Sequence, residues 1–341
     1  MTAKDNRFNV IHLSDTHIRS SNIDELIQFK DALVVDIKKL LSKDELKSSL
    51  ICFTGDLISR GDYGYNVENQ FSLAIDNLIY PLLLELEMEP DSFFIVPGNH
   101  EIDLSKVNSI YDSGLREELK NYNGELSIDY KKEETLRARL DDYRKFEIEV
   151  KKTCSDDIVN IDNIVINDQK IGVCLLNTSW NLASDSQNDK GKVIIGANLL
   201  KAGLQKIKKS DYKICLMHHS ISWLRDEDAA CVEPLLGEFD LVLYGHSHYA
   251  SQKQVISPNG KSIYCMASEA LPLSAKSGYN IIRFDGNNCT VMQRLYYVQR
   301  NEFDADLNIY EGQQIFTIGQ ADDKTLVFNA CVHTKKVFSI I

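Results

Sequence analysis

The stretch FNVIHLSDTH, residues 8–17, couples an apolar run to a polar ending. The same arrangement recurs in SLICFTGD at 49–56 and in SFFIVPGNHE at 92–101. Near-continuous apolar runs of about five or six residues are typical of strands that are buried on both faces of a sheet. Amphipathic segments with helical spacing separate these runs, at 23–41 and 67–86. The N-terminal part of the chain therefore predicts an α/β sheet with polar residues at its strand ends.

The middle of the chain, from 102 to about 157, is highly charged and has apolar residues at helical spacing. We expect a helical insert over the sheet edge, which either shapes the rim of a site or forms a solvated helix. Strand-like runs then resume in KIGVCLLNTSW at 170–180, YKICLMHH at 212–219 and DLVLYGHSH at 240–248. Each of these runs again ends in polar residues.

After residue 250 the helical signal fades. The runs KQVIS, KSIYCMAS and YNIIRFDGNNCTVMQRLYYV are interpreted as consecutive antiparallel strands with turn residues between them. We expect one domain over 1–300 and a β-rich extension over 301–341. The extension ends on the apolar run VFSII, and we expect that it leads into a further region of a longer parent protein.

Composition limits the classes of function. The formal net charge of −12 argues against an extended nucleic-acid surface, which needs an excess of basic residues. It does not exclude a local nucleotide site, because bound divalent cations reverse the field in an acidic pocket. We expect no membrane segment and a cytoplasmic location, since the chain has neither a signal-peptide pattern nor a long apolar run. The eight cysteines form no C-x-x-C pair, and several lie in apolar runs, as reduced, buried cysteines do.

The polar residues that end the strand-like runs have metal-binding chemistry. They are Asp15, His17, Asp56, Asn99, His100, His218, His219, His246 and His248. Ligands of open α/β sheets bind outside the carboxyl ends of the strands, so these side chains are expected to converge. Carboxylates and imidazoles without thiolates suit first-row divalent ions. The candidates exceed what one ion takes from a protein, so the set predicts two ions about 3.5–4 Å apart that share a carboxylate, as in phosphoester hydrolases.

The order of these motifs carries a resemblance. D-x-H (15–17), G-D (55–56), G-N-H-E (98–101), H-H (218–219) and G-H-x-H (245–248) occur in one series, each after an apolar run. This series resembles the calcineurin-like metallophosphoesterase superfamily. The resemblance implies a four-layer αββα sandwich of two mixed β-sheets flanked by helices, with the site at the strand ends and a helical insert beside it.

The resemblance also implies a role for each motif residue. It assigns one metal ion to Asp15, His17 and His248. It assigns a second ion to Asn99, His218 and His246. Asp56 would bridge the two ions, together with a hydroxide that attacks phosphorus. His100 would protonate the leaving oxygen or stabilise the transition state. His219 is a tentative substrate contact, with a supporting place behind the ligands as the alternative.

The G-H-x-H motif shows how two neighbouring histidines are expected to serve different ions. His246 and His248 are separated by one residue, and Gly245 is expected to let the backbone turn sharply enough to aim both rings inward. His12 lies inside the first apolar run and is interpreted as a core histidine with its hydrogen bonds satisfied. We expect two divalent ions, Mn²⁺ first, with Fe, Zn, Ni, Co and Mg as alternatives.

Departures from related patterns indicate a branch. GDLISRGD is similar to the G-D-x-x-D-R-G of protein serine/threonine phosphatases, but Ser59 stands where those enzymes have an aspartate. The opening motif is SDTH instead of their G-D-x-H-G, and HHSIS replaces the H-H-P-P of many phosphodiesterase-like relatives. The pattern therefore favours the phosphodiesterase and nuclease side. Arg60 is a tentative phosphate contact, with a surface ion pair as the alternative.

Three hypotheses follow from the sequence. The first is a dinuclear, metal-dependent phosphoesterase that hydrolyses a phosphodiester of the nucleotide or cyclic-nucleotide type. The second is a metal-dependent DNA or RNA nuclease, although the acidic net charge disfavours extended duplex binding. The third is an inactive, metal-loaded scaffold for a protein partner. A scaffold has no need for His100, so the complete motif set favours an enzyme.

Overall fold

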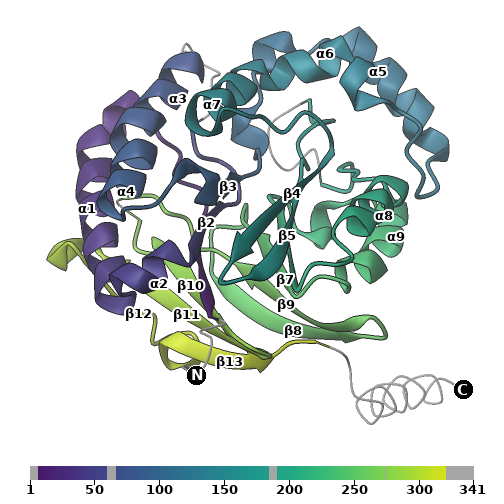
Figure 1. Cartoon of the computed structure of the whole chain (residues 1–341). Coiled ribbons are helices and arrows are strands. Elements are labelled where there is room, and N and C mark those ends of the chain that lie inside the picture. Colours follow the sequence, from purple (N-terminus) through teal and green to yellow (C-terminus); the bar gives the residue numbers. More distant parts are fainter. Residues whose placement is uncertain (1–6, 60–66, 184–189, 273, 320–341) are drawn as a thin grey trace, which may run out of the picture.

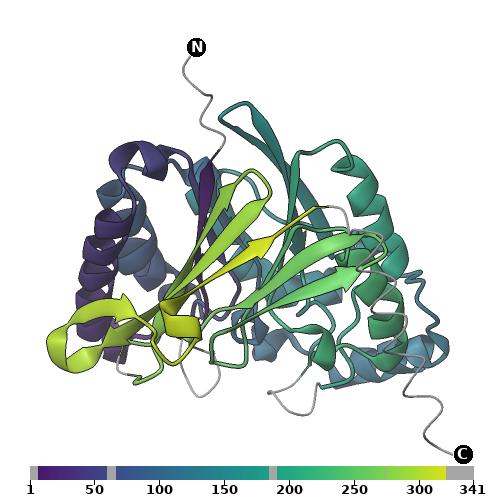
Figure 2. The ribbon, with the colours of Figure 1, turned by 90° about the horizontal axis from the view of Figure 1, so that it is seen from below.

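Two mixed β-sheets lie face to face in the computed structural model, with helices on their outer sides (Figure 1). The structure describes residues 7–59, 67–183, 190–272 and 274–319. Seen from below, the helices of the N-terminal part lie on one side, the later helices lie on the other, and the strands lie between them (Figure 2). The predicted four-layer α/β sandwich is confirmed.

The first sheet has seven strands in the order β12-β11-β10-β1-β2-β3, with β13 paired to β11. Its strands are β1 Phe8–Leu13, β2 Ser49–Phe53, β3 Phe93–Ile95, β10 Gly278–Asp285, β11 Asn288–Tyr297, β12 Glu302–Ala305 and β13 Gln313–Thr317. Strands β1, β2 and β3 are parallel to one another, whereas β10 to β13 pair in antiparallel fashion. The carboxyl ends of the three parallel strands therefore lie at one edge.

The second sheet has six strands in the order β4-β5-β6-β7-β9-β8. Its strands are β4 Val159–Ile166, β5 Gln169–Leu176, β6 Tyr212–Met217, β7 Leu241–Tyr244, β8 Ser251–Ser257 and β9 Gly260–Met266. Strands β5, β6, β7 and β9 are parallel, and the two edge strands are antiparallel to their neighbours. Again the parallel strands end side by side.

Helices cover the outer faces of both sheets, and further helices lie in the insert beside them (Figure 1). They are α1 Ile23–Leu40, α2 Lys43–Lys47, α3 Val67–Ala74, α4 Tyr80–Glu85, α5 Ser109–Glu118, α6 Glu134–Arg137, α7 Asp141–Lys151, α8 Ala197–Lys206 and α9 Asp226–Leu236. In α1, Leu26, Phe29 and Leu33 are fully buried at helical spacing. The predicted helix at 67–86 is divided, because a π-helical turn at Ile75–Ile79 joins α3 to α4.

The core between the sheets explains the near-continuous apolar runs. One cluster of buried side chains, which includes Phe8, Leu50, Phe94, Leu216 and Leu243, fills the space between the two sheets. Neighbouring residues of the same strands, such as those at 11, 51 and 242, belong to a second cluster that packs against the helices. A strand that is covered on both faces needs apolar residues at every position, which is the pattern that the sequence shows.

One expectation for the region after residue 250 is wrong in its detail. Strands β8 and β9 form an antiparallel hairpin in the second sheet, and β10 and β11 form another in the first. The antiparallel pairing expected of consecutive strands therefore holds within each hairpin, but β9 and β10 do not pair, because the chain crosses from the second sheet to the first between them. Each hairpin has its own local turn, but the segment at 267–277 that joins them carries no turn signal that assigns its two ends to different sheets.

The insert and the C-terminal extension each contribute to this architecture. Helices α5, α6 and α7 lie in the expected insert, and a small cluster of Leu115, Tyr122, Tyr130 and Leu136 packs there against Trp180. Strands β12 and β13 lie in the expected extension and pair with β11 of the first sheet. The domain boundary at residue 300 stays a prediction.

A buried ion pair connects α1 to the first sheet. Arg294 donates two hydrogen bonds to Asp36, at 2.8 and 2.7 Å, and the hydroxyl of Tyr279 donates a third at 2.8 Å. The side chain of Asp36 is 2% exposed and that of Arg294 is 12% exposed. The pair therefore fixes the helix to β10 and β11 from inside the protein.

We expect Asp36→Asn to destabilise the fold by about 3–5 kcal/mol, because it leaves Arg294 buried without its counter-charge. Tyr279→Phe removes one hydrogen bond to a charged group and should cost about 1.5–3 kcal/mol. Urea unfolding followed by circular dichroism measures both values. A loss for Asp36→Asn that is no larger than that for Tyr279→Phe would show that the ion pair does not hold the helix.

Candidate metal centre

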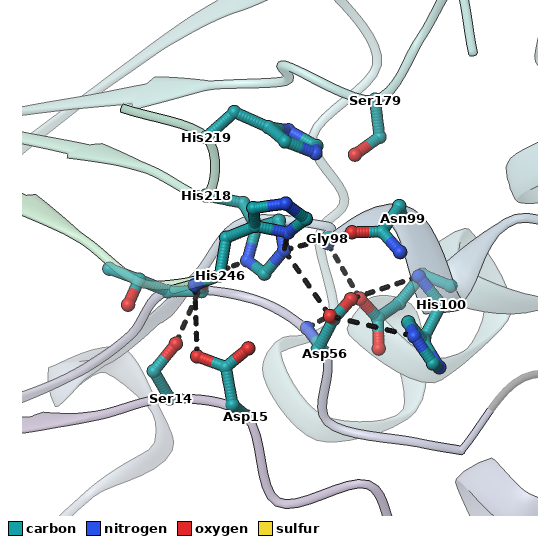
Figure 3. A network of polar contacts seen from close by, with 12 residues as sticks. Ser14, Asp15, Asp56, Gly98, Asn99, His100, Ser179, His218, His219 and His246 are labelled. Carbon is teal, nitrogen blue, oxygen red and sulfur yellow. Dashed lines mark hydrogen bonds and ion pairs between the residues drawn. The ribbon is translucent and has the colours of Figure 1, made fainter. Parts of the chain in front are cut away.

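The predicted site residues follow five strand ends. Asp15 and His17 come after β1, Asp56 after β2, Asn99 and His100 after β3, His218 and His219 after β6, and His246 and His248 after β7. Strands β1, β2 and β3 are parallel in one sheet, and β6 and β7 are parallel in the other. Because the two sheets face each other, the five loops meet at one place (Figure 3).

The backbone of these loops is unusual. Asp15, His17, Asp56, His246 and His248 all have positive φ values, between 46° and 70°. A residue other than glycine is destabilised by about 1–3 kcal/mol when its backbone has a positive φ, and such residues are concentrated at functional sites. The loops are therefore held in a conformation that local preference does not favour.

Glycines allow the loops to approach one another. A Cβ atom on Gly98 would lie 2.2 Å from Oδ1 of Asp56, and one on Gly245 would lie 2.0 Å from Oγ of Ser14. Gly245 is not among the glycines with positive φ. Its expected role as a sharp backbone turn is therefore replaced by a different one: it leaves room for the loop that carries Asp15.

One group of candidate ligands is formed by Asp15, His17, Asp56 and His248. Nε2 of His248 lies 3.3 Å from Oδ1 of Asp15 and 3.3 Å from Nε2 of His17. Asp15 is fully buried, and its Oδ1 has no hydrogen bond of good geometry within the described part of the chain. A buried carboxylate oxygen that faces imidazole nitrogens in this way fits a bound cation.

A second group surrounds His218. Its Nδ1 donates to the backbone oxygen of Thr54 at 2.6 Å, which leaves the lone pair of Nε2 directed into the centre. That Nε2 lies 3.3 Å from Oδ2 of Asp56, 3.2 Å from Oδ1 of Asn99 and 3.1 Å from Nδ1 of His246. The oxygens of Asp56 and Asn99 only accept, and Nε2 of His218 also accepts when its ring is neutral, so a proton or a metal ion is needed among these three atoms.

Asp56 lies between the two groups. It is in the first group by the proximity of its oxygens, and its Oδ2 also contacts His218 of the second. The backbone N–H of His100 donates to its Oδ1 at 2.9 Å. Burial alone would raise the pKa of Asp56, but His218 and His100 hold it well below its ordinary value. The carboxylate is thus charged and placed where it could contact two ions.

The histidines respond to this field in opposite ways. Burial would lower the pKa of His218, but the adjacent Asp56 raises it to about 9. The adjacent carboxylates of Asp15 and Glu269 raise the pKa of His248 to about 10. Burial and the nearby His218 lower the pKa of His246 to about 3. In each group the protein therefore favours one positive charge next to a carboxylate, as a site built for cations does.

His100 lies beside the first group, whereas His219 belongs to the second by the proximity of its ring nitrogen to those of His218 and His246. Nε2 of His100 is 3.9 Å from Oδ2 of Asp56, and its ring packs edge-on against His17 at 4.5 Å between centroids. The side chain of His100 is 27% exposed, so it can meet a ligand from solvent. His219 is buried, and its Nδ1 contacts Oγ1 of Thr178 at 2.9 Å. Arg60, the tentative phosphate contact, lies outside the described residues.

Two residues that support the site were not predicted from the sequence. The buried carboxylate of Glu101 accepts backbone hydrogen bonds from Gly98, Asp56 and Ile58, at 2.6, 2.8 and 3.2 Å. It therefore joins the loop after β2 to the loop after β3, and its place as the last letter of G-N-H-E was the available signal. The second residue is Glu269, whose Oε2 lies 2.9 Å from Nδ1 of His248. No motif marks it.

One prediction outside the motifs, the core histidine, is confirmed. His12 is fully buried and contacts Thr54 and Asn280, as expected of a core histidine. The seven cysteines in the described part of the chain are free, and five of them are buried. No helix among the described residues is long and apolar enough to cross a membrane.

Comparisons with known proteins agree with the geometry. The model of the calcineurin-like phosphoesterase family matches residues 8–250. Among solved structures, PhoD is similar with a TM-score of 0.52 and 10% identity, over 93% of this chain and 70% of that one. GAP50, the anchor in the inner membrane complex of Plasmodium, gives a TM-score of 0.48 and 15% identity, over 94% and 90%. No curated protein matches the sequence.

The match with PhoD, at this low identity, supports the fold alone. The family model carries more, because it spans the five motifs from Asp15 to His248 that the fold brings together. Enzymes of this family hydrolyse phosphoester bonds, and this chain carries two groups of candidate metal ligands. It is therefore a hydrolase of that class. The chain belongs to the calcineurin-like phosphoesterase family.

Proposed function

We propose that the protein is a two-metal phosphodiesterase that acts on a nucleotide-like substrate. The observation that supports this most directly is the position of Asp56, whose carboxylate lies between two groups of buried imidazoles and oxygens. A single cation does not account for both groups, whereas a pair of ions that share Asp56 does.

The two groups suggest an assignment of ligands. Asp15, His17 and His248 would hold the first ion, and Asn99, His218 and His246 would hold the second. The amide oxygen of Asn99 adds a ligand without adding negative charge, which keeps the second group close to neutral. The pairing of His246 with one group and of His248 with the other follows from their contacts with His218 and Asp15.

Mn²⁺ suits a donor set of carboxylates, imidazoles and one amide, with Fe, Zn, Ni, Co and Mg as alternatives. When bound, such ions lower the pKa of water to give the attacking hydroxide and neutralise the phosphate charge. The residues of the chain supply the rest. Asp56 keeps its negative charge at all ordinary pH values, because His218 and His100 hold its pKa well below the usual range.

His100 is the group best placed to act on the leaving oxygen. It is half-buried next to Asp56, and its backbone is fixed by the hydrogen bond to that carboxylate. A protonated imidazole there would donate its proton to the departing alkoxide. His219 lies close to His218 and His246 but is buried, and its contact with Thr178 favours a supporting role over direct contact with substrate.

A diester needs room for a second organic group. A pocket of about 380 Å³ lies beside the loops that carry the H-H and G-H-x-H motifs. Its lining includes Ser220, Ser222, Ser247, Tyr249 and Lys253. It offers hydroxyls, one ammonium group and an exposed aromatic ring, which suit a ring-bearing polar group of a nucleotide. We infer a cytoplasmic location from the free, mostly buried cysteines, which fit a reducing compartment.

The first test is hydrolysis of bis-p-nitrophenyl phosphate by the chelator-treated protein, with and without added Mn²⁺. We expect turnover that depends on the metal, and Asp56→Asn should reduce kcat by more than about 100-fold, since even partners of ligands cost about 10–100-fold. Asp91→Asn, which changes an exposed aspartate in the same way, is the matched control and should have wild-type activity.

Two results would replace the proposal. Cleavage of single-stranded DNA or RNA much faster than of mononucleotide diesters, and dependent on Asp56, would show a nuclease. Two bound ions with no turnover of mono- and diesters in the presence of Mn²⁺, Ni²⁺ or Co²⁺ would show a metal-loaded scaffold.

The second test concerns His100. We expect His100→Ala to lower kcat about 10²–10⁴-fold on a diester with a poor leaving group, because the alkoxide then departs without a proton. The loss should be much smaller for bis-p-nitrophenyl phosphate than for diphenyl phosphate, since nitrophenolate needs little protonation. Metal analysis of the variant should still give two ions. An equal loss on both esters would assign His100 to charge stabilisation instead of proton transfer.

A further inference from the structure

The crossover from the second sheet to the first, described at 267–272 and 274–277, lies against the metal centre. The N–H of Ala267 donates to the backbone oxygen of Tyr244, immediately before the G-H-x-H loop, at 3.1 Å. The N–H of Ala270 donates to the backbone oxygen of Ser14, next to Asp15, at 2.9 Å. The crossover is therefore attached to two of the loops that carry candidate ligands.

Glu269 lies between these two attachments and points to His248. Its Oε2 is 2.9 Å from Nδ1 of His248, and the hydroxyl of Ser274 donates to its other oxygen, Oε1. The side chain of Glu269 is 11% exposed. A second contact fixes its backbone, because the N–H of Gly278 donates to its carbonyl oxygen at 2.9 Å. The carboxylate is thus held in place before it meets the histidine.

His248 needs such a partner more than the other candidate ligands do. Its side chain is 40% exposed, so packing does not fix the ring. With a proton on Nδ1 directed at Glu269, the neutral ring presents the lone pair of Nε2 to Asp15 and His17, each 3.3 Å away. A carboxylate behind a metal-binding histidine commonly fixes the tautomer and the orientation of the ring in this way.

In the second group of ligands, the ring of His218 is oriented without a carboxylate. Nδ1 of His218 donates to the backbone oxygen of Thr54, and the ring is fully buried. Within the described ranges, Glu269 is the one glutamate whose side chain forms an ion pair with a motif histidine. The two groups of ligands therefore differ in what holds them.

We propose that Glu269 is a positioning residue for His248, through which the crossover controls binding of one of the two metal ions. The ion held by Asp15, His17 and His248 depends on it, and the ion held by Asn99, His218 and His246 does not. The inference rests on the two-ion site of the proposed function, but it does not require that any particular ester be the substrate.

The test compares metal binding in four variants of the whole chain. Glu269→Ala removes the acceptor, Glu269→Gln keeps an oxygen that can still accept from Nδ1, and Ser274→Ala removes the hydroxyl that holds the carboxylate. Glu125→Gln, on the exposed insert, is the matched control. Mn²⁺ binding is followed by equilibrium dialysis with metal analysis, and by electron paramagnetic resonance, which distinguishes a spin-coupled pair from an isolated ion.

We expect Glu269→Ala to weaken one of the two binding steps by about 10–100-fold and to leave the other unchanged. At a metal concentration that fills both sites of the wild type but only the unaffected site of Glu269→Ala, the variant should give the spectrum of an isolated ion and the wild type that of the coupled pair. Glu269→Gln should recover a large part of the loss, Ser274→Ala should lose less than Glu269→Ala, and Glu125→Gln should match the wild type.

Two unchanged binding steps in Glu269→Ala would overturn the proposal. So would an equal loss of both steps with a lower unfolding temperature of the metal-free variant, because that result indicates a structural role. A wild type that binds two ions but hydrolyses no ester would refute the proposed function and leave the positioning role in place. A wild type that binds no ion would refute both.

Discussion

Acceptor atoms that face one another without donors are the constraint on which this structure depends. Nε2 of His218 meets oxygens of Asp56 and Asn99, and Nε2 of His248 meets Asp15, all within about 3.3 Å. Such an arrangement is unfavourable unless positive charge lies among the atoms. The raised pKa values of both histidines, about 9 and 10, show that the protein favours that charge.

The two sheets stabilise the unusual conformation of the loops that carry these atoms. The loops leave strands that are buried on both faces, so the start of each loop is fixed by the core between the sheets and by the helices outside it. Positive φ values at Asp15, Asp56 and His246 are stable only because neighbouring loops hold them, as Glu101 does for the chain at Asp56 and Gly98. A rigid scaffold holds reacting groups more accurately than free loops do.

Much of this could be predicted from the sequence. Apolar runs marked the buried strands β1, β2, β3, β6 and β7, because strands covered on both faces leave a continuous signal. The polar ending of each run marked the candidate ligands, because the ends of parallel strands meet at one edge. The pairing of strands after residue 250 could not be predicted, since alternation shows that a segment is a strand but not which sheet it joins.

The sequence by itself therefore determined the strands, the family and the motif residues at the strand ends. Only the tertiary structure decided which supporting groups act together: that Glu101 joins the loops of Asp56 and Gly98, that Gly245 gives room to Ser14, and that Glu269 contacts His248 from the crossover. These are contacts between segments far apart in the chain. No local pattern records them, because they arise from the way in which the two sheets face each other.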